Sequence, residues 1–200
     1  TSSIQADQNT TYGLSKLGAE ELLLNLNKDF KVPVHIFRLP NVFGKWSKPN
    51  YNSVVSTFCH NIIRDIPIQI ENESTIIELV YIDDVIKRFI ELIDSSGKTI
   101  NPSGYTLISP SFKITLGELA KQLYAFKKMI KSKILESVGT GLIRALYSTY
   151  VSYLPTEKFS YPISQMKDSR GSFTELLKTK NCGQFSYFTS HPGVTRGDHY

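Results

Sequence analysis

The stretch Tyr12-Gly13-Leu14-Ser15-Lys16, with Ser2-Ser3-Ile4-Gln5-Ala6 shortly before it, decides how the rest of this sequence is interpreted. A Tyr and a Lys four positions apart at the start of a helix project from one face, one turn apart. The Lys ammonium stabilises the phenolate, so the Tyr can give or take a proton at a carbonyl or alcohol oxygen near neutral pH. A hydroxyl such as Ser3, at the end of a strand, can hold the same oxygen. Together these residues predict a site for carbonyl–alcohol interconversion.

The Tyr-x-x-x-Lys spacing alone is a weak signal, because many surface helices carry it by chance. A partly buried Tyr beside a solvated Lys then explains it equally simply. The surrounding sequence is more specific. A helix predicted from about Thr10 to Asn27, with Glu20 and Glu21 on its solvent side, leads into Val32–Leu39, which is typical of a buried strand. That strand would deliver Asn41 to the carboxyl edge of a sheet, where ligands of such sheets bind.

This order of parts resembles the extended short-chain dehydrogenase/reductase family. The resemblance implies an α/β fold, the C-terminal part of a Rossmann-like reductase domain. It implies that Ser3, Tyr12 and Lys16 are catalytic, and that Tyr12 and Lys16 also contact a nicotinamide cofactor, NADPH or NADH. Pro40 and Asn41 are expected beside the cofactor, with Asn41 also reaching the substrate.

The polar loop from Lys45 to Ser53 precedes a helix predicted from about Val54 to Arg64. Its side chains offer stacking and hydrogen-bond donors to a sugar nucleotide, with Lys48, Asn50 and Asn52 as substrate-binding candidates. An ordinary surface loop with Trp46 packed into the core is an equal alternative.

The middle of the sequence predicts alternating strands and helices. Asp83-Asp84 is interpreted as an acidic helix start, which the helix dipole favours, in preference to a metal pair, because no third ligand is in view. The capping-box pattern at Thr115-Leu116-Gly117-Glu118 predicts another helix start. The expected strands are Ile66–Ile70, Ile76–Ile82 and Gly104–Ile108, and the further helices run from Asp83 to Ile93 and from about Thr140 to Tyr150.

Prolines and a change of pattern place a domain boundary after Leu154. We expect residues 1–154 to form a partial NAD(P)-dependent epimerase/reductase domain, and 155–200 to form the start of a truncated cupin domain, a β jelly-roll. Arg-Gly-x-Phe-x-Glu followed by Gly-x-His resembles the opening of a cupin. That resemblance implies a sugar pocket lined by Arg170 and Glu175, and a zinc site whose first ligand is His199. One His cannot make a zinc site, so His199 is expected to be unliganded in this sequence.

Taken over its whole length, the sequence resembles reductase–cupin fusion enzymes of capsular polysaccharide biosynthesis. The resemblance implies C3 epimerisation of a UDP-linked 4-keto-6-deoxy-N-acetyl amino sugar by the cupin, then C4 reduction with NADPH. It places the enzyme in the UDP-N-acetyl-L-fucosamine pathway, in a bacterial cytoplasm, as a homodimer when full length.

Composition limits the alternatives. Hydrophobic residues at 40%, charged residues at 20% and a net charge of +5 describe an ordinary globular chain. The basic stretch from Lys121 to Lys133 lacks a nucleic-acid motif, and no apolar run approaches the ~20 residues of a membrane span. Two separated cysteines indicate reduced thiols. None of the twelve glycines makes a pyrophosphate-binding turn, so we expect an internal fragment, nearly inactive alone, whose phosphate-binding half lies elsewhere.

Two other functions remain open at this point. A UDP-sugar 4-epimerase or 4,6-dehydratase would use the same Tyr and Lys, although such enzymes usually lack a cupin-like tail. A non-catalytic sugar-nucleotide-binding module of a polysaccharide assembly complex would need neither residue for chemistry.

Overall fold

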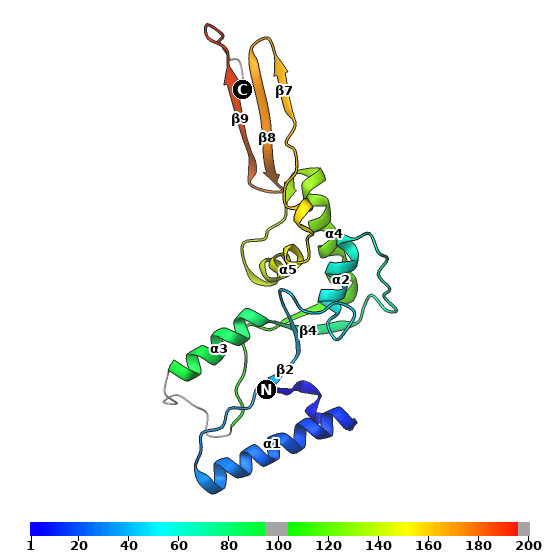
Figure 1. The fold of residues 1–200 in the computed structure, drawn as a ribbon, viewed down its shortest axis with the longest axis vertical. Helices are drawn as coiled ribbons and strands as arrows, with labels where there is room; N and C mark the ends of the chain where they lie inside the picture. The colour runs from blue at the N-terminus through cyan, green and yellow to red at the C-terminus, as the bar shows by residue number, and fades with distance from the viewer. Residues whose placement is uncertain (95–103, 196–200) are drawn as a thin grey trace.

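The computed structural model of the chain describes residues 1–94 and 104–195. The molecule is elongated (Figure 1). Helix α1 (Thr11–Phe30) lies at one end, strands β7 (Gln165–Asp168), β8 (Gly171–Thr179) and β9 (Gly183–Ser190) lie at the other, and a helical body lies between them. The remaining elements are β1 (Ser2–Ser3), the 3₁₀ turn η1 (Ile4–Asp7), β2 (Arg38–Leu39), β3 (Asn41–Phe43), α2 (Val54–Ile63), β4 (Ile76–Tyr81), α3 (Ile82–Asp94), β5 (Phe112–Thr115), α4 (Leu116–Ser132), β6 (Ile134–Leu135), α5 (Gly141–Val151) and η2 (Thr156–Lys158).

Short parallel pairings form the α/β part. β1 pairs with β2 in parallel, with Ser2 opposite Arg38 and Ser3 opposite Leu39. Parallel strands need a long crossover between them, and α1 supplies it. β3 pairs with β4 in parallel, and β5 adds to β4 in the antiparallel direction. The predicted α/β class is therefore confirmed.

The start and end of α1 follow from local chemistry. The Thr10 hydroxyl accepts a hydrogen bond of 3.0 Å from the Gly13 amide, as expected of an N-cap. The helix ends at Phe30, three residues beyond the predicted Asn27, and Lys31 after it adopts a left-handed φ of 57°. Several of its leucines are exposed, with Leu22 at 74%. The prediction that Glu20 faces solvent is wrong, because its carboxylate is buried against Arg38.

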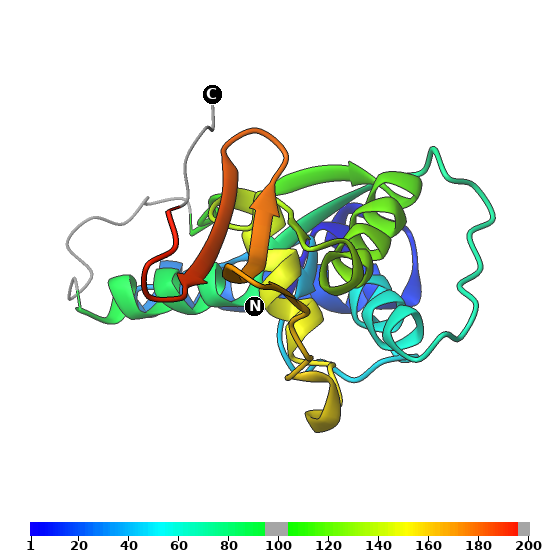
Figure 2. The same cartoon turned by 90° about the horizontal axis from the view of Figure 1, so that it is seen from above.

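The main core lies where α2, α4 and α5 pack on β3 and β4. α2 and α4 run side by side, as Figure 2 shows from above. The Phe43 and Tyr81 rings, 5.5 Å apart, come from the two parallel strands beneath them. Fully buried side chains from each element close this core, among them Leu79, Leu119, Leu123 and Leu146.

Three strand predictions differ from the structure. Of Val32–Leu39 only β2 is a strand, and of Gly104–Ile108 only Tyr105 forms a bridge, to Ile36. Ile66–Ile70 is not a strand. Pro67 has no amide to donate to a ladder, and the segment instead packs Ile68 and Ile70 against the core. The predicted helices at α2, α3, α4 and α5 and the strand at β4 are confirmed to within a few residues.

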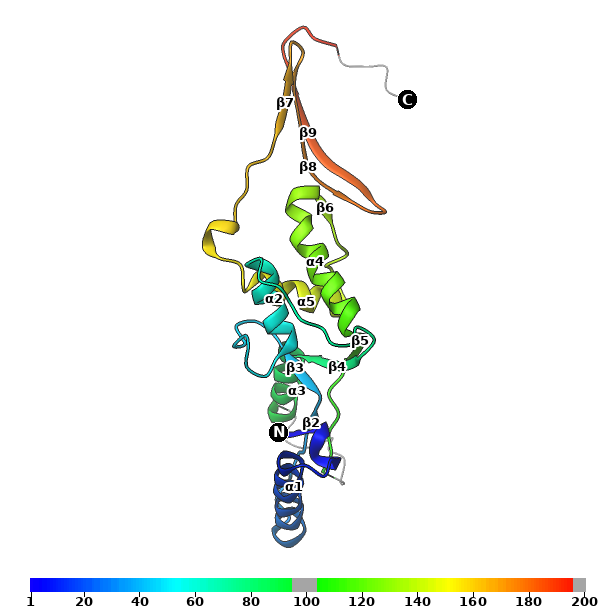
Figure 3. The same ribbon diagram turned by 90° about the vertical axis from the view of Figure 1, so that its right-hand side faces the viewer.

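The last part of the chain forms an antiparallel ribbon that extends away from the helices, as Figure 3 shows. β8 lies between β7 and β9, and its end also pairs in parallel with β6. Phe173 faces Met166 on one side and Phe188 on the other, so an apolar row crosses the ribbon. Within the described ranges, no helix combines the length and the apolar character that a bilayer crossing requires.

Candidate active site

Tyr12 and Lys16 lie in the first two turns of α1 and face one another. The Lys16 ammonium is 5.5 Å from the centre of the Tyr12 ring, within the range of a cation–π attraction. The Tyr12 side chain is 52% exposed, so its hydroxyl is open to a ligand. Geometry therefore supports the predicted pairing of these two side chains on one helix face.

Ser3 ends β1, in the segment that leads into α1. Its hydroxyl oxygen accepts a hydrogen bond of 3.2 Å from the Gln5 amide and so caps η1. A hydroxyl that accepts in this way still has its own hydrogen to donate. Ser3 can therefore serve as a cap and hold a ligand oxygen at the same time.

Pro40 connects β2, the strand that pairs with Ser3, to β3, and Asn41 is the first residue of β3. The Asn41 side-chain amide donates to the Glu78 carbonyl oxygen at 3.1 Å, which ties it to β4. Asn41 is nevertheless exposed. Its amide oxygen can still accept a hydrogen bond from a ligand.

A buried ion pair next to these residues was missed by sequence reasoning. Arg38 donates to the Glu20 carboxylate through Nε at 3.0 Å and through Nη2 at 2.7 Å, and the Glu20 side chain is only 2% exposed. Burial opposes ionisation of Glu20, but the hydrogen bonds from Arg38 and Tyr105 and the charge of Arg38 act against it, and the pKa of Glu20 lies below its ordinary value. The hydrogen bonds that Arg38 donates to Glu20 likewise raise the pKa of Arg38.

Two signals in the sequence point to this pair. Glu20 follows Tyr12 and Lys16 at successive spacings of four, which places all three along one stripe of a helix. Arg38 is the one charged residue in the apolar run Val34-His35-Ile36-Phe37-Arg38-Leu39 if His is taken as neutral, and a buried Arg needs a carboxylate partner.

The candidate substrate loop is held at three points. The Asn50 amide donates to the Thr57 hydroxyl at 2.9 Å, the Trp46 amide donates to the Ser152 hydroxyl at 3.4 Å, and the Tyr153 hydroxyl donates to the Ser47 carbonyl. Trp46 and Asn50 both adopt left-handed φ values, near 60°. Such values are uncommon outside glycine and mark a loop whose shape is fixed by its surroundings.

This loop presents rings and cations to solvent. Trp46 is 80% exposed, so the alternative in which it packs into the core is wrong. Lys48 lies 5.6 Å from the centre of the exposed Tyr51 ring, and Lys45 lies 5.9 Å from that of Trp46. Lys48, Asn50 and Asn52 are all exposed, as a binding role requires.

Arg170 and Glu175 do not pair with each other. Arg170 donates to Asp168 at 2.8 Å in the turn between β7 and β8, and Glu175, on β8, lies 4.0 Å from Lys178. Arg170 borders a groove of about 520 Å³ on the ribbon, together with Met166, Phe173 and Phe188. His199 lies outside the described residues. Among the described residues, no group of three or more His, Cys, Asp or Glu side chains could hold a metal ion.

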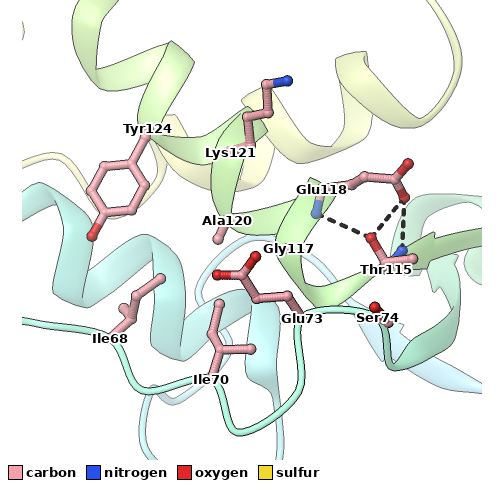
Figure 4. A pocket seen from close by; sticks show the side chains of 10 residues that line it. All are labelled: Ile68, Ile70, Glu73, Ser74, Thr115, Gly117, Glu118, Ala120, Lys121 and Tyr124. Atoms are coloured by element: carbon pink, nitrogen blue, oxygen red, sulfur yellow. Dashed lines mark hydrogen bonds between the residues drawn. The ribbon is translucent and has the colours of Figure 1, made fainter.

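A hollow of about 720 Å³ contains none of the predicted site residues. Figure 4 shows it between the segment from Ile68 to Ser74 and the start of α4. Glu118 lines this hollow, but its carboxylate already takes part in the capping box. It accepts hydrogen bonds from the Thr115 amide at 3.0 Å and from the Thr115 hydroxyl at 2.9 Å. The hollow is therefore shaped by a helix start, and we assign it no function.

Comparison with known proteins adds two families. The NAD dependent epimerase/dehydratase family matches residues 1–102, and the polysaccharide biosynthesis C-terminal domain matches residues 166–200. The UDP-2-acetamido-2,6-beta-L-arabino-hexul-4-ose reductase of Pseudomonas aeruginosa strain PA103 is 59% identical over 200 residues, which make up 100% of this chain and 53% of that protein.

Solved structures show the same fold. The crystal structure of the capsular polysaccharide assembling protein CapF from Staphylococcus aureus is 44% identical, with a TM-score of 0.90, covering 98% of this chain and 53% of that one. The Bordetella bronchiseptica enzyme WbmF in complex with NADH has a TM-score of 0.58 at 16% identity, covering 73% of this chain and 53% of that one, and this likeness concerns the fold alone.

The chain spans about half the length of these relatives. Its first 102 residues carry β1 to α3, including Ser3, Tyr12, Lys16 and Asn41. Because the family match covers more than half of its 200 residues, the chain belongs to the NAD dependent epimerase/dehydratase family.

Proposed function

We propose that the full-length protein reduces the C4 ketone of a UDP-linked 4-keto-6-deoxy-N-acetyl amino sugar in the biosynthesis of a bacterial capsular polysaccharide. The observation that carries this proposal is the 59% identity, over all 200 residues, to a reductase named for such a UDP-hexulose. The likeness to CapF supports the link to capsular polysaccharide, and we place the reaction in the UDP-N-acetyl-L-fucosamine pathway.

The residues of α1 fit this chemistry. Tyr12 donates its phenolic proton to the C4 oxygen as the alcohol forms, which prevents a free alkoxide from accumulating. The Lys16 ammonium, held over the Tyr12 ring, stabilises the phenolate that remains, and Ser3 donates a hydrogen bond to the same ketone oxygen. A nicotinamide cofactor, when bound, supplies the hydride, and we propose NADPH in preference to NADH.

Other exposed residues suit binding roles. Lys16 would also hold the nicotinamide ribose, and Pro40 and Asn41, where β2 passes into β3, would border the cofactor. The fixed loop after β3 supports sugar-nucleotide binding, with Lys48, Asn50 and Asn52 as donors and with Trp46 free to stack on the base. Asn41, which is exposed, would also contact the substrate.

We assign residues 1–154 to the reductase unit and residues 155–200 to the start of a cupin, which would epimerise the sugar at C3 before reduction. The separate family match over residues 166–200 supports a boundary near Pro155. Arg170 and Glu175 would line the epimerase pocket. The described residues supply no zinc site, so we derive no step through zinc, and His199 would be only its first ligand in a complete domain. We further propose a homodimer in the bacterial cytoplasm.

Replacing Tyr12 by Phe in the full-length protein tests the reductase assignment. The expected result is a fall in kcat for ketone-dependent NADPH oxidation of about 10²- to 10⁴-fold, with the KM for the sugar nucleotide largely unchanged. Tyr124→Phe, on α4 and outside the site, is the matched control and should retain wild-type rates. Full activity in the Tyr12→Phe variant would overturn the proposal.

Two alternatives give other results in the same experiment. A UDP-sugar 4-epimerase or 4,6-dehydratase would also lose activity with Tyr12, but wild-type protein would return its NAD to the starting state without net oxidation of NADPH. A sugar-nucleotide-binding module would bind the substrate and show no Tyr12-dependent turnover at all.

A further inference from the structure

A single guanidinium joins three segments of the chain. Arg38, on β2, donates through Nη1 to the Asp7 carboxylate at 2.6 Å and through Nε and Nη2 to the Glu20 carboxylate. Asp7 is the last residue of η1, and Glu20 lies in the middle of α1. Arg38 thereby connects η1, α1 and β2 at one point.

These three segments carry the residues of the proposed site. η1 follows Ser3 directly and leads to Tyr12 on α1, four residues before Lys16. β2 pairs with β1 at Ser3 and continues, through Pro40, to Asn41. A small displacement of α1 relative to β1 and β2 would therefore change the position of Tyr12 relative to Ser3.

The contacts of Arg38 hold its partners in a fixed geometry. The Glu20 side chain is 2% exposed and that of Arg38 is 24% exposed, so the pair is largely removed from water. Two donors of a planar guanidinium fix the carboxylate in angle as well as in distance, which a single ammonium does not. Tyr105 adds a fourth side chain, because its hydroxyl donates to Glu20 at 3.1 Å and its ring lies 4.9 Å from the Arg38 guanidinium carbon.

We propose that Arg38 and Glu20 are positioning residues for the proposed reduction, which hold Tyr12 and Lys16 in register with Ser3 through the shared hydrogen bonds to Asp7 and Glu20. The inference rests on the proposed function, since it concerns the alignment of the same site. Neither residue touches the reacting atoms. Their effect passes through the backbone of α1 and η1.

Arg38→Lys in the full-length protein is the first test. Lysine keeps the charge but cannot donate to Glu20 in bidentate fashion and to Asp7 at once. The expected result is a fall in kcat of roughly 10- to 100-fold, because displacements of about 1 Å are enough to misalign a proton donor. The KM for the sugar nucleotide should stay within about 2-fold of wild type, since the loop that binds it is held elsewhere. Arg88→Lys, in the exposed pair with Glu91 on α3, is the control and should change neither parameter.

A second variant separates alignment from stability. Changing Glu20 and Arg38 together to Met removes both charges, so no unpaired ion is left buried and the protein can keep its thermal midpoint. The positioning role predicts that kcat stays low in this folded double variant. Recovery of wild-type kcat with a wild-type thermal midpoint would show that the pair serves only stability and would overturn the inference.

Amide hydrogen exchange supplies a readout without turnover. In the Arg38→Lys variant the amides of residues 11–16 should exchange faster than in wild type, while those of the α2–α4 core should not change. Unchanged exchange at residues 11–16 contradicts the inference whatever the activity. If Tyr12→Phe keeps full activity, the proposed function fails; if Tyr12→Phe is inactive but Arg38→Lys is normal in kcat, only the positioning role fails.

Discussion

The Lys45 ammonium donates a hydrogen bond of 3.0 Å to the Asp83 carboxylate and so joins the end of β3 to the first turn of α3. The same ammonium lies 6.0 Å from the centre of the Tyr81 ring and 5.9 Å from that of Trp46. The hydrogen bond to Asp83 outweighs burial and raises the pKa of Lys45 above its ordinary value. Asp83 therefore keeps in place the cation with which the candidate substrate loop begins.

Asp83→Asn should weaken this connection. We expect a loss of less than about 1 kcal/mol in the free energy of unfolding, because both side chains are partly exposed and water screens the pair. Urea unfolding at low and high salt measures it, and the loss should shrink as salt rises. Asp84→Asn, in the same helix turn, controls for the helix dipole. Equal losses in the two variants would mean that the ion pair contributes nothing.

The capping box at the start of α4 gives a prediction for acid. Glu118 accepts from the Thr115 amide and hydroxyl, and these hydrogen bonds lower the pKa of Glu118 from 4.5. A carboxyl group whose pKa is lower in the folded than in the unfolded state stabilises the fold at pH values above its unfolded-state pKa. That contribution is lost as pH falls through its folded-state pKa.

Glu118→Gln should accordingly be less stable than wild type at neutral pH, and the difference should shrink as pH falls below 4.5 towards the lowered pKa of the folded state. Urea midpoints of both proteins across this range provide the measurement. Thr115→Ala removes the cap itself and should cost about 1 kcal/mol, with less dependence on pH. A Glu118→Gln difference that grows in acid would contradict this assignment.

The features that could be predicted from sequence are those whose causes are local. Thr10 caps a helix within three residues, and Thr115 and Glu118 cap another through each other, so their positions needed no knowledge of the fold. Tyr12 and Lys16 share one helix face for the same reason, since four residues of one helix fix their separation.

The features that were missed depend on distant partners. Glu20 is buried only because Arg38, 18 residues later, returns to it on β2. Ile66–Ile70 has the composition of a strand but packs two isoleucines on the core and forms no ladder. The exposure of Trp46 depends on hydrogen bonds with Thr57, Ser152 and Tyr153, which hold its loop in place from α2 and from the turn after α5. Composition records none of these long-range contacts.

Two glycines of α1 should respond in opposite ways to alanine. A Cβ at Gly13 would overlap the carbonyl oxygens of Gln5 and Gln8, whereas one at Gly18 meets nothing within 4 Å. Gly13→Ala must therefore shift η1 against α1, next to Tyr12, and should lower both stability and kcat of the full-length protein. Gly18→Ala removes backbone freedom from the unfolded chain and should stabilise by about 0.5–1 kcal/mol. Thermal unfolding and the reductase assay compare the two variants directly. A Gly13→Ala variant with wild-type thermal midpoint and kcat would show that the two carbonyl groups can move away at little cost.

The two cysteines should differ sharply in reactivity. Cys59, on α2, is 0% exposed, and burial raises the pKa of its thiol, so little thiolate forms there at neutral pH. Cys182 lies exposed in the turn between β8 and β9. Iodoacetamide should thus label Cys182 in the native protein within minutes and label Cys59 only when denaturant opens the α2–α4 core. Peptide mass spectrometry reads the two sites separately, and Cys182→Ser should leave Cys59 protected. If Cys59 were labelled without denaturant as fast as Cys182, α2 would have to open locally, because a buried thiol has no other route to the reagent.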